Sequence, residues 1–305
     1  MSNKDELIKV VKESNKDIEK LILDGFKHYK RTGKNHDEES DSLVTDLIRI
    51  YYDLGYKDIC FNNMKKSFVK KYILNESKLE GVNPLSLHGK QELEGLLKMY
   101  QYMHSDKIEA NFNILTLRNL HKELYSCTPY PEFGGNFRTT FTYLRGAKTD
   151  ICDWTKIYPS LLELNDYVFK LRELAPMVKE VHHSKEILRY LDKCSELSCK
   201  LIKIHPFVDG NGRTVRCFIN KLMEDGGLPS VYVKNQERLW YFDSMRKAMD
   251  DEDYSHINMF YRYKVCDSIV ELDINDRLLA RKTESRKQTS SDAEKVKIYT
   301  SHENR

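Results

Sequence analysis

The sequence predicts an all-α protein, and three observations carry this prediction. Apolar residues recur at intervals of three and four along most of the chain, which is the spacing of one face of an α-helix. Glycine and proline, which interrupt helices, number only 13 and 7 among 305 residues. The segment TTFTYLRG, residues 139–146, has instead the alternation of a strand, so we expect one small β-hairpin among the helices.

The amino-terminal region is predicted to be a helical bundle of about 80 residues. Helical periodicity covers residues 5–30, 41–54 and 58–74. The segment EGVNPLSLHG, residues 80–89, interrupts the pattern with two glycines and a proline. We therefore expect a first region at residues 1–88, followed by the main domain.

The main domain is expected to span residues 89–268 and to be helical. The periodicity predicts helices at 89–104, 111–126, 153–175 and 184–204, a helix that begins near 211, and two more beyond 235. The helix at 184–204 should end at His205, because Pro206 disfavours helical geometry in the residue before it. Residues 281–305 hold four apolar side chains, so the tail at 269–305 is predicted to be polar and disordered.

Composition narrows the class of protein. The chain carries 50 Lys and Arg against 47 Asp and Glu, a net charge of only +3, which gives no overall attraction to nucleic acid or to a membrane surface. Its seven cysteines form no CxxC pair, so we expect reduced thiols rather than a disulfide framework or a zinc ribbon. No apolar run approaches the ~18 residues of a membrane helix. We expect a cytoplasmic protein with no nucleic-acid or membrane partner.

The stretch HPFVDGNGRTVR, residues 205–216, combines the side chains of a phosphate site. An apolar helical stripe follows it, so GNGR lies where a loop becomes the first turn of a helix. Glycines at 210 and 212 let unpaired N–H groups approach an anion, and the helix dipole favours negative charge there. Arg213 and Arg216 lie three residues apart on one face. Two guanidinium groups indicate a ligand with more than one phosphate.

Other phosphate loops and metal motifs do not fit this stretch. A Walker loop, GxxxxGK[ST], is absent, and a dinucleotide fingerprint would need glycine where Val215 stands. His205 is not part of a zinc motif, and a neutral imidazole suits a general base. Asp209 supplies the oxygen that Mg²⁺ prefers. A lone His-Pro or a lone GNG would usually be structural; together with two arginines and a carboxylate they indicate a site.

The stretch resembles the signature HPFx[DE]GNGRxxR of the Fic domain family at every specified position. LHKEL at 120–124, GGNFR at 134–138 and the stretch 186–260 are also similar to that family, so the resemblance covers roughly residues 90–265. It implies an all-α domain with a small hairpin. It also implies an enzyme that transfers AMP from ATP to a hydroxyl side chain of a target protein, with release of pyrophosphate and with Mg²⁺.

The resemblance also implies roles for individual residues. His205 would be the base, Asp209 the Mg²⁺ ligand, and Phe207 a core anchor in the nucleotide-binding loop. The nucleotide would be held by Gly210 and Gly212 as the anion hole, Asn211 at the α-phosphate, Arg213 at the β-phosphate, Arg216 at the γ-phosphate and Tyr241 beside the base. The hairpin resembles the family's flap, on which the target docks at Thr140, Phe141, Thr142 and Tyr143.

Two departures and one further motif qualify this resemblance. The prolines common after the flap are missing, and Met249 stands where the family often has asparagine beside the base. ESKLEG, residues 76–81, resembles the family's inhibitory segment [ST]xxxE[GN], although Glu76 replaces its Ser or Thr. Glu80 would then pair with Arg216 in the space that a γ-phosphate needs. The alternative is that Glu80 only closes a helix before Gly81.

Several functions stay open at this point. A catalytically silent interaction module is the alternative from another class. Removal of AMP, or transfer of another nucleotide by the same site, are alternatives within the enzyme interpretation, and relatives with altered motifs move phosphate or phosphocholine. The target protein is open, and so is a homodimer.

Overall fold

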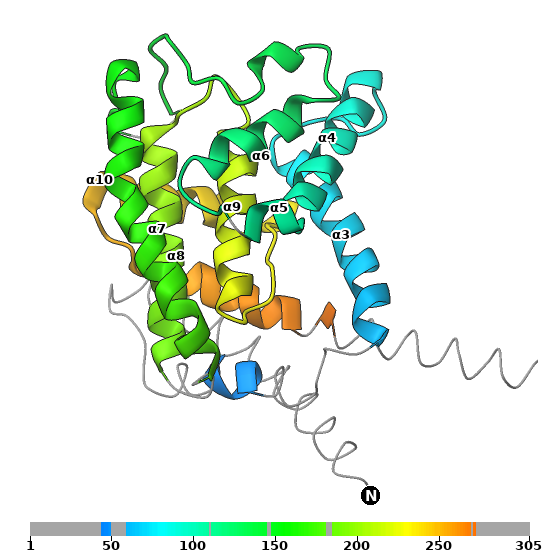
Figure 1. Ribbon diagram of the computed structural model, residues 1–305, viewed down its shortest axis with the longest axis vertical. Coiled ribbons are helices and arrows are strands. Elements are labelled where there is room, and N and C mark those ends of the chain that lie inside the picture. Colours follow the sequence, from blue (N-terminus) through cyan, green and yellow to red (C-terminus); the bar gives the residue numbers. More distant parts are fainter. Residues whose placement is uncertain are drawn as a thin grey trace, which may run out of the picture.

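The computed structural model describes residues 44–49, 59–109, 111–144, 148–180, 185–269 and 271–272. Within these residues the secondary structure is helical and no strand is formed, which confirms the all-α prediction (Figure 1). The helices are α3 (Ile59–Leu79), α4 (Leu87–Met103), α5 (Asp106–Glu109), α6 (Thr116–Tyr125), α7 (Ile157–Glu180), α8 (Glu186–Ile204), α9 (Asn211–Asp225) and α10 (Arg238–Asp251). Short 3₁₀ turns are η1 (Pro131–Phe133), η2 (Trp154–Lys156) and η3 (Asn235–Glu237), and residues 255–269 and 271–272 are also helical.

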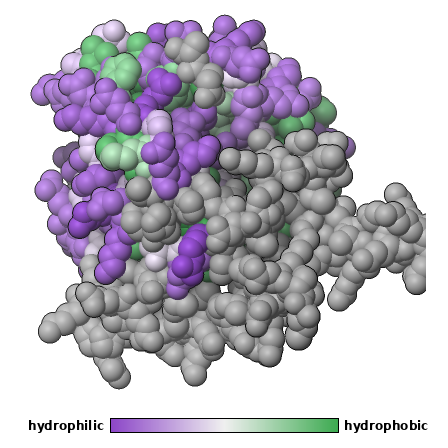
Figure 2. All heavy atoms as spheres, turned by 60° about the horizontal axis from the view of Figure 1, so that its bottom comes forward, coloured by the Kyte–Doolittle hydropathy of each residue, from purple (hydrophilic) through white to green (hydrophobic). Residues whose placement is uncertain are grey.

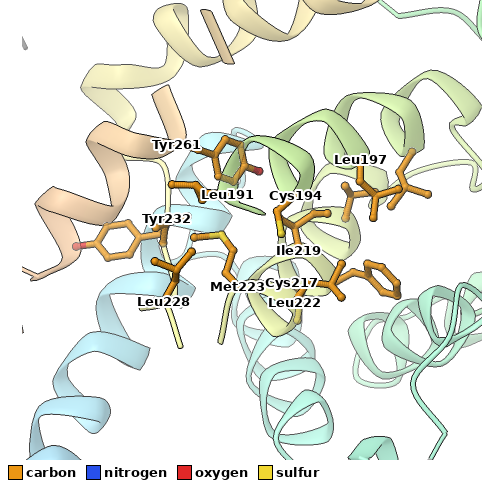
Figure 3. Close-up of a cluster of buried hydrophobic side chains, with 14 of the residues drawn as sticks. Leu191, Cys194, Leu197, Cys217, Ile219, Leu222, Met223, Leu228, Tyr232 and Tyr261 are labelled. Atoms are coloured by element: carbon orange, nitrogen blue, oxygen red, sulfur yellow. The ribbon is translucent and has the colours of Figure 1, made fainter. Parts of the chain in front are cut away.

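Helix α9 lies at the centre of the fold. It packs against α4, α6, α7 and α8, and the sulfur and aliphatic side chains of α8 and α9 form a continuous core (Figure 3). Cys194 and Leu197 of α8 meet Cys217, Ile219 and Leu222 of α9 there. Because α9 is surrounded, the polar residues of its first two turns are buried as well. Buried charges must be paired, and this requirement organises the site.

Backbone geometry at both ends of the motif follows from the residue types. Helix α8 ends at His205, which has φ 51° while its N–H donates to the Leu201 carbonyl; Pro206 excludes continuation, as expected. Gly210 has φ 76° and precedes α9. A Cβ there would lie 3.0 Å from Tyr125 and 3.1 Å from Leu124, so glycine is required both for the left-handed backbone and for the space.

Helix α3 ends in a Schellman motif. The N–H of Gly81 donates to the Lys78 carbonyl and the N–H of Val82 donates to the Ser77 carbonyl, while Gly81 has φ 78°. Glu80 is therefore the C-cap residue of α3. Ser86 then caps α4, because its side chain accepts from the Gly89 N–H at 2.9 Å. The boundary expected at residue 88 falls inside the first turn of α4.

The predicted β-hairpin at 139–146 is not present as strands in the part of it that the structure describes, residues 139–144. Phe141 and Tyr143 are 78% and 83% exposed, so the alternating residues have no face to cover. Side chains hold the backbone instead. The Arg138 guanidinium donates to the Thr140 carbonyl, and the Asp250 carboxylate accepts from the Thr149 N–H at 2.8 Å. Side-chain anchoring replaces the ladder that the pattern predicted.

Three other expectations fall largely outside the described residues. The predicted helix at 5–30 lies outside them, and the one at 41–54 is described only at 44–49, which is helical. Of the tail at 269–305, only 269, 271 and 272 are described. No described helix is long and apolar enough to cross a membrane. On the face shown in Figure 2 most described side chains are hydrophilic, with small hydrophobic groups among them.

Candidate active site

The amino terminus of α9 is the centre of the candidate site. The first turn, from Asn211, follows directly on Gly210, and the N-cap has no side-chain hydrogen bond. Unpaired N–H groups and the positive end of the helix dipole therefore face the adjoining cavity. Gly212 has no side chain to block this approach: a Cβ there would lie 2.7 Å from a carboxylate oxygen of Glu80 and 2.8 Å from Nη1 of Arg216. The Glu80 carboxylate thus lies over the helix terminus.

Two carboxylates from α3 pair with Arg216. Nη2 of Arg216 donates to Glu80 Oε1 at 2.6 Å. Glu76, one helical turn earlier, accepts from Nε at 2.8 and 3.1 Å and lies 2.8 Å from Nη2. Burial by itself would lower the pKa of Arg216, but the two carboxylates raise it well above its usual value. The guanidinium therefore stays charged.

The charge state of Glu76 follows from its contacts. Burial raises the pKa of Glu76, and the charge of Arg216 opposes that rise. Both oxygens of Glu76 accept hydrogen bonds from the guanidinium, which is the geometry of a carboxylate with an arginine. We assign the ionised form. The sequence drew attention to Glu76 only as a mismatch in the inhibitory motif.

Arg213 is held by a different pair of carboxylates. It is 3% exposed and donates from Nη1 to Glu92 of α4 and from Nη2 to Asp209 at 3.2 Å. Asp209 also accepts from the Tyr125 hydroxyl at 2.9 Å. Burial would raise the pKa of Asp209, but Arg213, the Gly210 N–H and Tyr125 together lower it. Glu92 and Tyr125 were not predicted, since their positions carry no local signal of the pairing.

Asp209 fits a magnesium site in which the protein supplies few ligands. Its side chain is 72% exposed at the edge of the anion site, and Mg²⁺ on a polyphosphate keeps several waters and takes one or two carboxylates. No group of three or more His, Cys, Asp or Glu that could hold a metal occurs among the residues described. Asp209 could therefore serve as one ligand of such an ion.

His205 faces the same cavity from the end of α8. Burial lowers its pKa, although the Ile202 carbonyl acts in the opposite sense, and the positive charge of Arg138 adds to the lowering. The neutral imidazole needed for a general base is thus favoured at neutral pH.

Arg138 joins the flap to the motif loop, which sequence reasoning missed. Its guanidinium donates to the carbonyls of His205 at 2.7 Å, Thr140 at 2.8 Å and Cys152, and its backbone N–H donates to the Pro206 carbonyl at 2.9 Å. It is 2% exposed. None of the described carboxylates pairs with it, because carbonyl oxygens fill its donors. The motif GGNFR contained the signal, in its final arginine.

His121 and Asn211 hold the loop from inside. The Gly135 N–H donates to Nδ1 of His121, so Nε2 carries the proton and donates to the Asp209 carbonyl at 2.9 Å. Burial lowers the pKa of His121 to about 4, which keeps this form neutral. Its ring stacks on the fully buried ring of Phe207 with a centroid distance of 3.8 Å, so Phe207 anchors the loop in the core.

The Asn211 side chain is placed differently from the role implied by the resemblance. It is 3% exposed, and its amide accepts from the Phe207 N–H at 2.9 Å and donates to the Phe207 carbonyl at 2.8 Å. Both ends of the amide are used within the loop. Asn211 thus sets the shape of the loop.

A cavity of about 600 Å³ adjoins these groups. Its lining includes Glu80, His205, Gly212, Arg216 and Tyr241, all predicted site residues. The other lining residues are Leu144, Ile202, Arg238, Leu239, Phe242, Met245, Arg246 and Met249. Helix α10 supplies five apolar or aromatic side chains and two arginines to this lining, and the centre of the Tyr241 ring lies 5.7 Å from the Arg216 guanidinium carbon. The cavity is lined by both arginine and apolar side chains, a combination that suits a nucleotide.

The predicted flap residues border this region without lining the cavity. Thr140, Phe141 and Tyr143 are exposed, and Thr142 is half-buried. The neighbouring Leu144 lines the cavity.

Comparisons with known proteins find similarity to Fic proteins. The family model described as the Fic/DOC family matches residues 111–223. The chain is 26% identical over 206 residues to the protein adenylyltransferase Fic of Culex quinquefasciatus, covering 67% of this chain and 37% of that protein. It is 35% identical over 78 residues to that of Nematostella vectensis, covering 26% of this chain and 17% of that protein. The chain thus spans less than two-fifths of the length of these relatives.

Solved structures show the same fold. Fic-1 from C. elegans matches with a TM-score of 0.59 at 19% identity, covering 79% of this chain and 74% of that one. A Fic-domain signaling protein from Bacteroides thetaiotaomicron matches with a TM-score of 0.58 at 16% identity, covering 77% and 96%. Residues 111–223 of this chain thus match the Fic/DOC family, and the fold around them is that of the solved Fic structures.

Proposed function

We propose that this chain is a protein adenylyltransferase that transfers AMP from ATP to a Ser, Thr or Tyr hydroxyl of a target protein. The observation that carries the proposal is the shared cavity: His205, Arg216 and the open amino terminus of α9 all face it. The name of the curated relatives, protein adenylyltransferase, supports the same activity.

The phosphates of ATP would bind at the amino terminus of α9. Backbone N–H groups at Asn211 and Gly212 would donate to phosphate oxygens, and the missing side chain of Gly212 permits the approach. Arg213 would donate hydrogen bonds to the second phosphate and Arg216 to the third. Both arginines also pair with the carboxylates described above, which partly neutralise their charge. Mg²⁺ held beside Asp209 would offset the phosphate charge.

His205 would act as the general base. The buried, neutral imidazole takes the proton of the target hydroxyl, whose oxygen bonds to the α-phosphorus while the bond from that phosphorus to the bridging oxygen breaks. Pyrophosphate leaves and AMP stays on the target. Arg138 positions this histidine by fixing the His205 and Pro206 carbonyls.

The base would lie against α10 and the target against the flap. Tyr241, Met245 and Met249 form an apolar wall that suits a planar nucleobase. Exposed Phe141 and Tyr143 beside the cavity would bind an extended segment of the target.

Glu80 would hold the enzyme in an inhibited state. Its carboxylate accepts a hydrogen bond from Nη2 of Arg216 and lies 2.7 Å from the position that a Cβ at Gly212 would occupy. A phosphate at the helix terminus needs the same place and the same guanidinium. Glu80 also caps α3, so its capping role and its inhibitory role are compatible.

A labelling experiment tests the proposal. Protein with Glu80→Gly, and the same protein with His205→Ala added, are incubated with labelled ATP, GTP, UTP or CTP and cell lysate. We expect label from ATP on a lysate protein or on the chain itself, and loss of that label with His205→Ala. Equal labelling by both proteins would refute the role of His205, and no label from any nucleotide would favour the silent interaction module.

A further inference from the structure

Glu76 is a second carboxylate at Arg216 that the proposed mechanism does not use. It is fully buried, on α3, and accepts from Nε of Arg216 through both oxygens. Glu80 occupies a different environment: its side chain is 29% exposed and it lines the cavity. Glu76 does not line the cavity.

This difference decides which carboxylate can leave. Glu80 stands at the end of α3 beside open space, so rotation of its side chain takes it away from Arg216 into the cavity or solvent. Glu76 lies between α3 and α9, and separation from Arg216 would leave two buried charges unpaired. When Glu80 departs, Glu76 therefore stays on Arg216.

We propose that Glu76 is a specificity-determining residue, a fixed counter-charge that prevents the site from favouring a nucleoside triphosphate over a diphosphate. This inference rests on the proposed function, in which Arg216 meets the third phosphate. A free guanidinium would attract that phosphate. The Glu76–Arg216 pair is neutral as a unit, and its carboxylate repels the incoming anion across a short, poorly screened distance.

The other arginine of the motif does not restore the lost attraction. Arg213 is already shared between Glu92 and Asp209. Tyr241 presents the face of its ring to Arg216. The ring carries no net charge. The third phosphate would still find N–H donors on Arg216, but little net positive charge from the two motif arginines.

Calorimetry tests this directly on the Glu80→Gly protein. ATP, ADP and AMP are titrated at fixed Mg²⁺ and ionic strength, and we expect ATP to bind no more than about threefold tighter than ADP. Addition of Glu76→Gln removes the charge and keeps most of the shape of the side chain. It should raise the affinity for ATP by tenfold or more and change the affinities for ADP and AMP by less than threefold. Glu237→Gln is the matched control: Glu237 is a buried carboxylate paired with Lys264 and does not line the cavity.

The outcomes separate the two proposals. ATP that binds at least tenfold tighter than ADP to the Glu80→Gly protein would overturn the role of Glu76 while leaving the proposed function intact. The same holds if Glu76→Gln weakens ATP, since Glu76 would then only hold Arg216 in place. Absence of binding by every nucleotide would overturn both. If a thermal melt shows that the Glu76→Gln protein does not fold, the ratio of ATP to ADP affinity in the Glu80→Gly protein still tests the role of Glu76.

Discussion

Replacement of Glu80 by glycine is the most direct test of self-inhibition. The contact to be lost is one charge-assisted hydrogen bond of 2.6 Å between a side chain that is 29% exposed and one that is 5% exposed. Hydrogen bonds to charged groups contribute about 1.5–3 kcal/mol. Because about 1.4 kcal/mol corresponds to a factor of ten, we expect ATP affinity and the labelling rate to rise roughly 10- to 100-fold, near the lower end because Glu76 still holds Arg216.

The assay is the initial rate of label transfer from ATP to the target or to the chain itself, measured across a range of ATP and Mg²⁺ concentrations. Lys78→Gly is the matched control, because it also places glycine at the end of α3 but removes an exposed side chain. It should leave the labelling rate unchanged. Arg216→Ala should not reproduce the activation, since it removes the anchor of the phosphate together with that of Glu80.

Two results would refute this reasoning. If Glu80→Gly labels no faster than the unmodified chain at any ATP concentration, Glu80 is only the C-cap of α3. If Lys78→Gly activates equally, loosening of the helix end is the cause, and the Glu80–Arg216 contact is not.

Three further predictions concern the chemistry and its support. His205→Ala should lower the transfer rate by roughly 10²–10⁴-fold and leave ATP binding in calorimetry nearly unchanged; loss of binding would make His205 structural. Because burial lowers the pKa of His205, its base form persists below pH ~6.5, so the rate should fall only at more acidic pH; a pH–rate profile that falls at or above pH ~6.5 would contradict this. Asp209→Ala should lower Mg²⁺-dependent activity without unfolding the chain, and full activity of the unmodified chain in EDTA would remove the metal role. Arg138→Gln should move the acidic limb of the pH–rate profile upward, because a positive charge beside His205 is lost, and Arg138→Lys should restore part of that shift; a uniform loss of rate with no shift would leave Arg138 a purely structural residue.

The sequence by itself determined the helices and the place of the motif among them. Periodicity of apolar residues, Pro206 after His205 and glycine at 210 are local signals, and each acts within a few residues of its effect. The end of α8 and the start of α9 therefore fall where they were predicted. The strand-like pattern at 139–146 was misleading because alternation indicates a strand only where one face is covered, and Phe141 and Tyr143 are exposed.

Only the tertiary structure decided the partners of the charged groups. Arg213 meets Glu92 from 121 residues away, and Arg216 meets Glu76 from 140 residues away. Nothing local encodes such pairs: they arise because α9 is surrounded on all sides, and burial of its arginines forces the enclosing helices to supply carboxylates. The chemistry of the motif is readable from twelve residues, whereas the charge that a ligand meets there depends on α3 and α4.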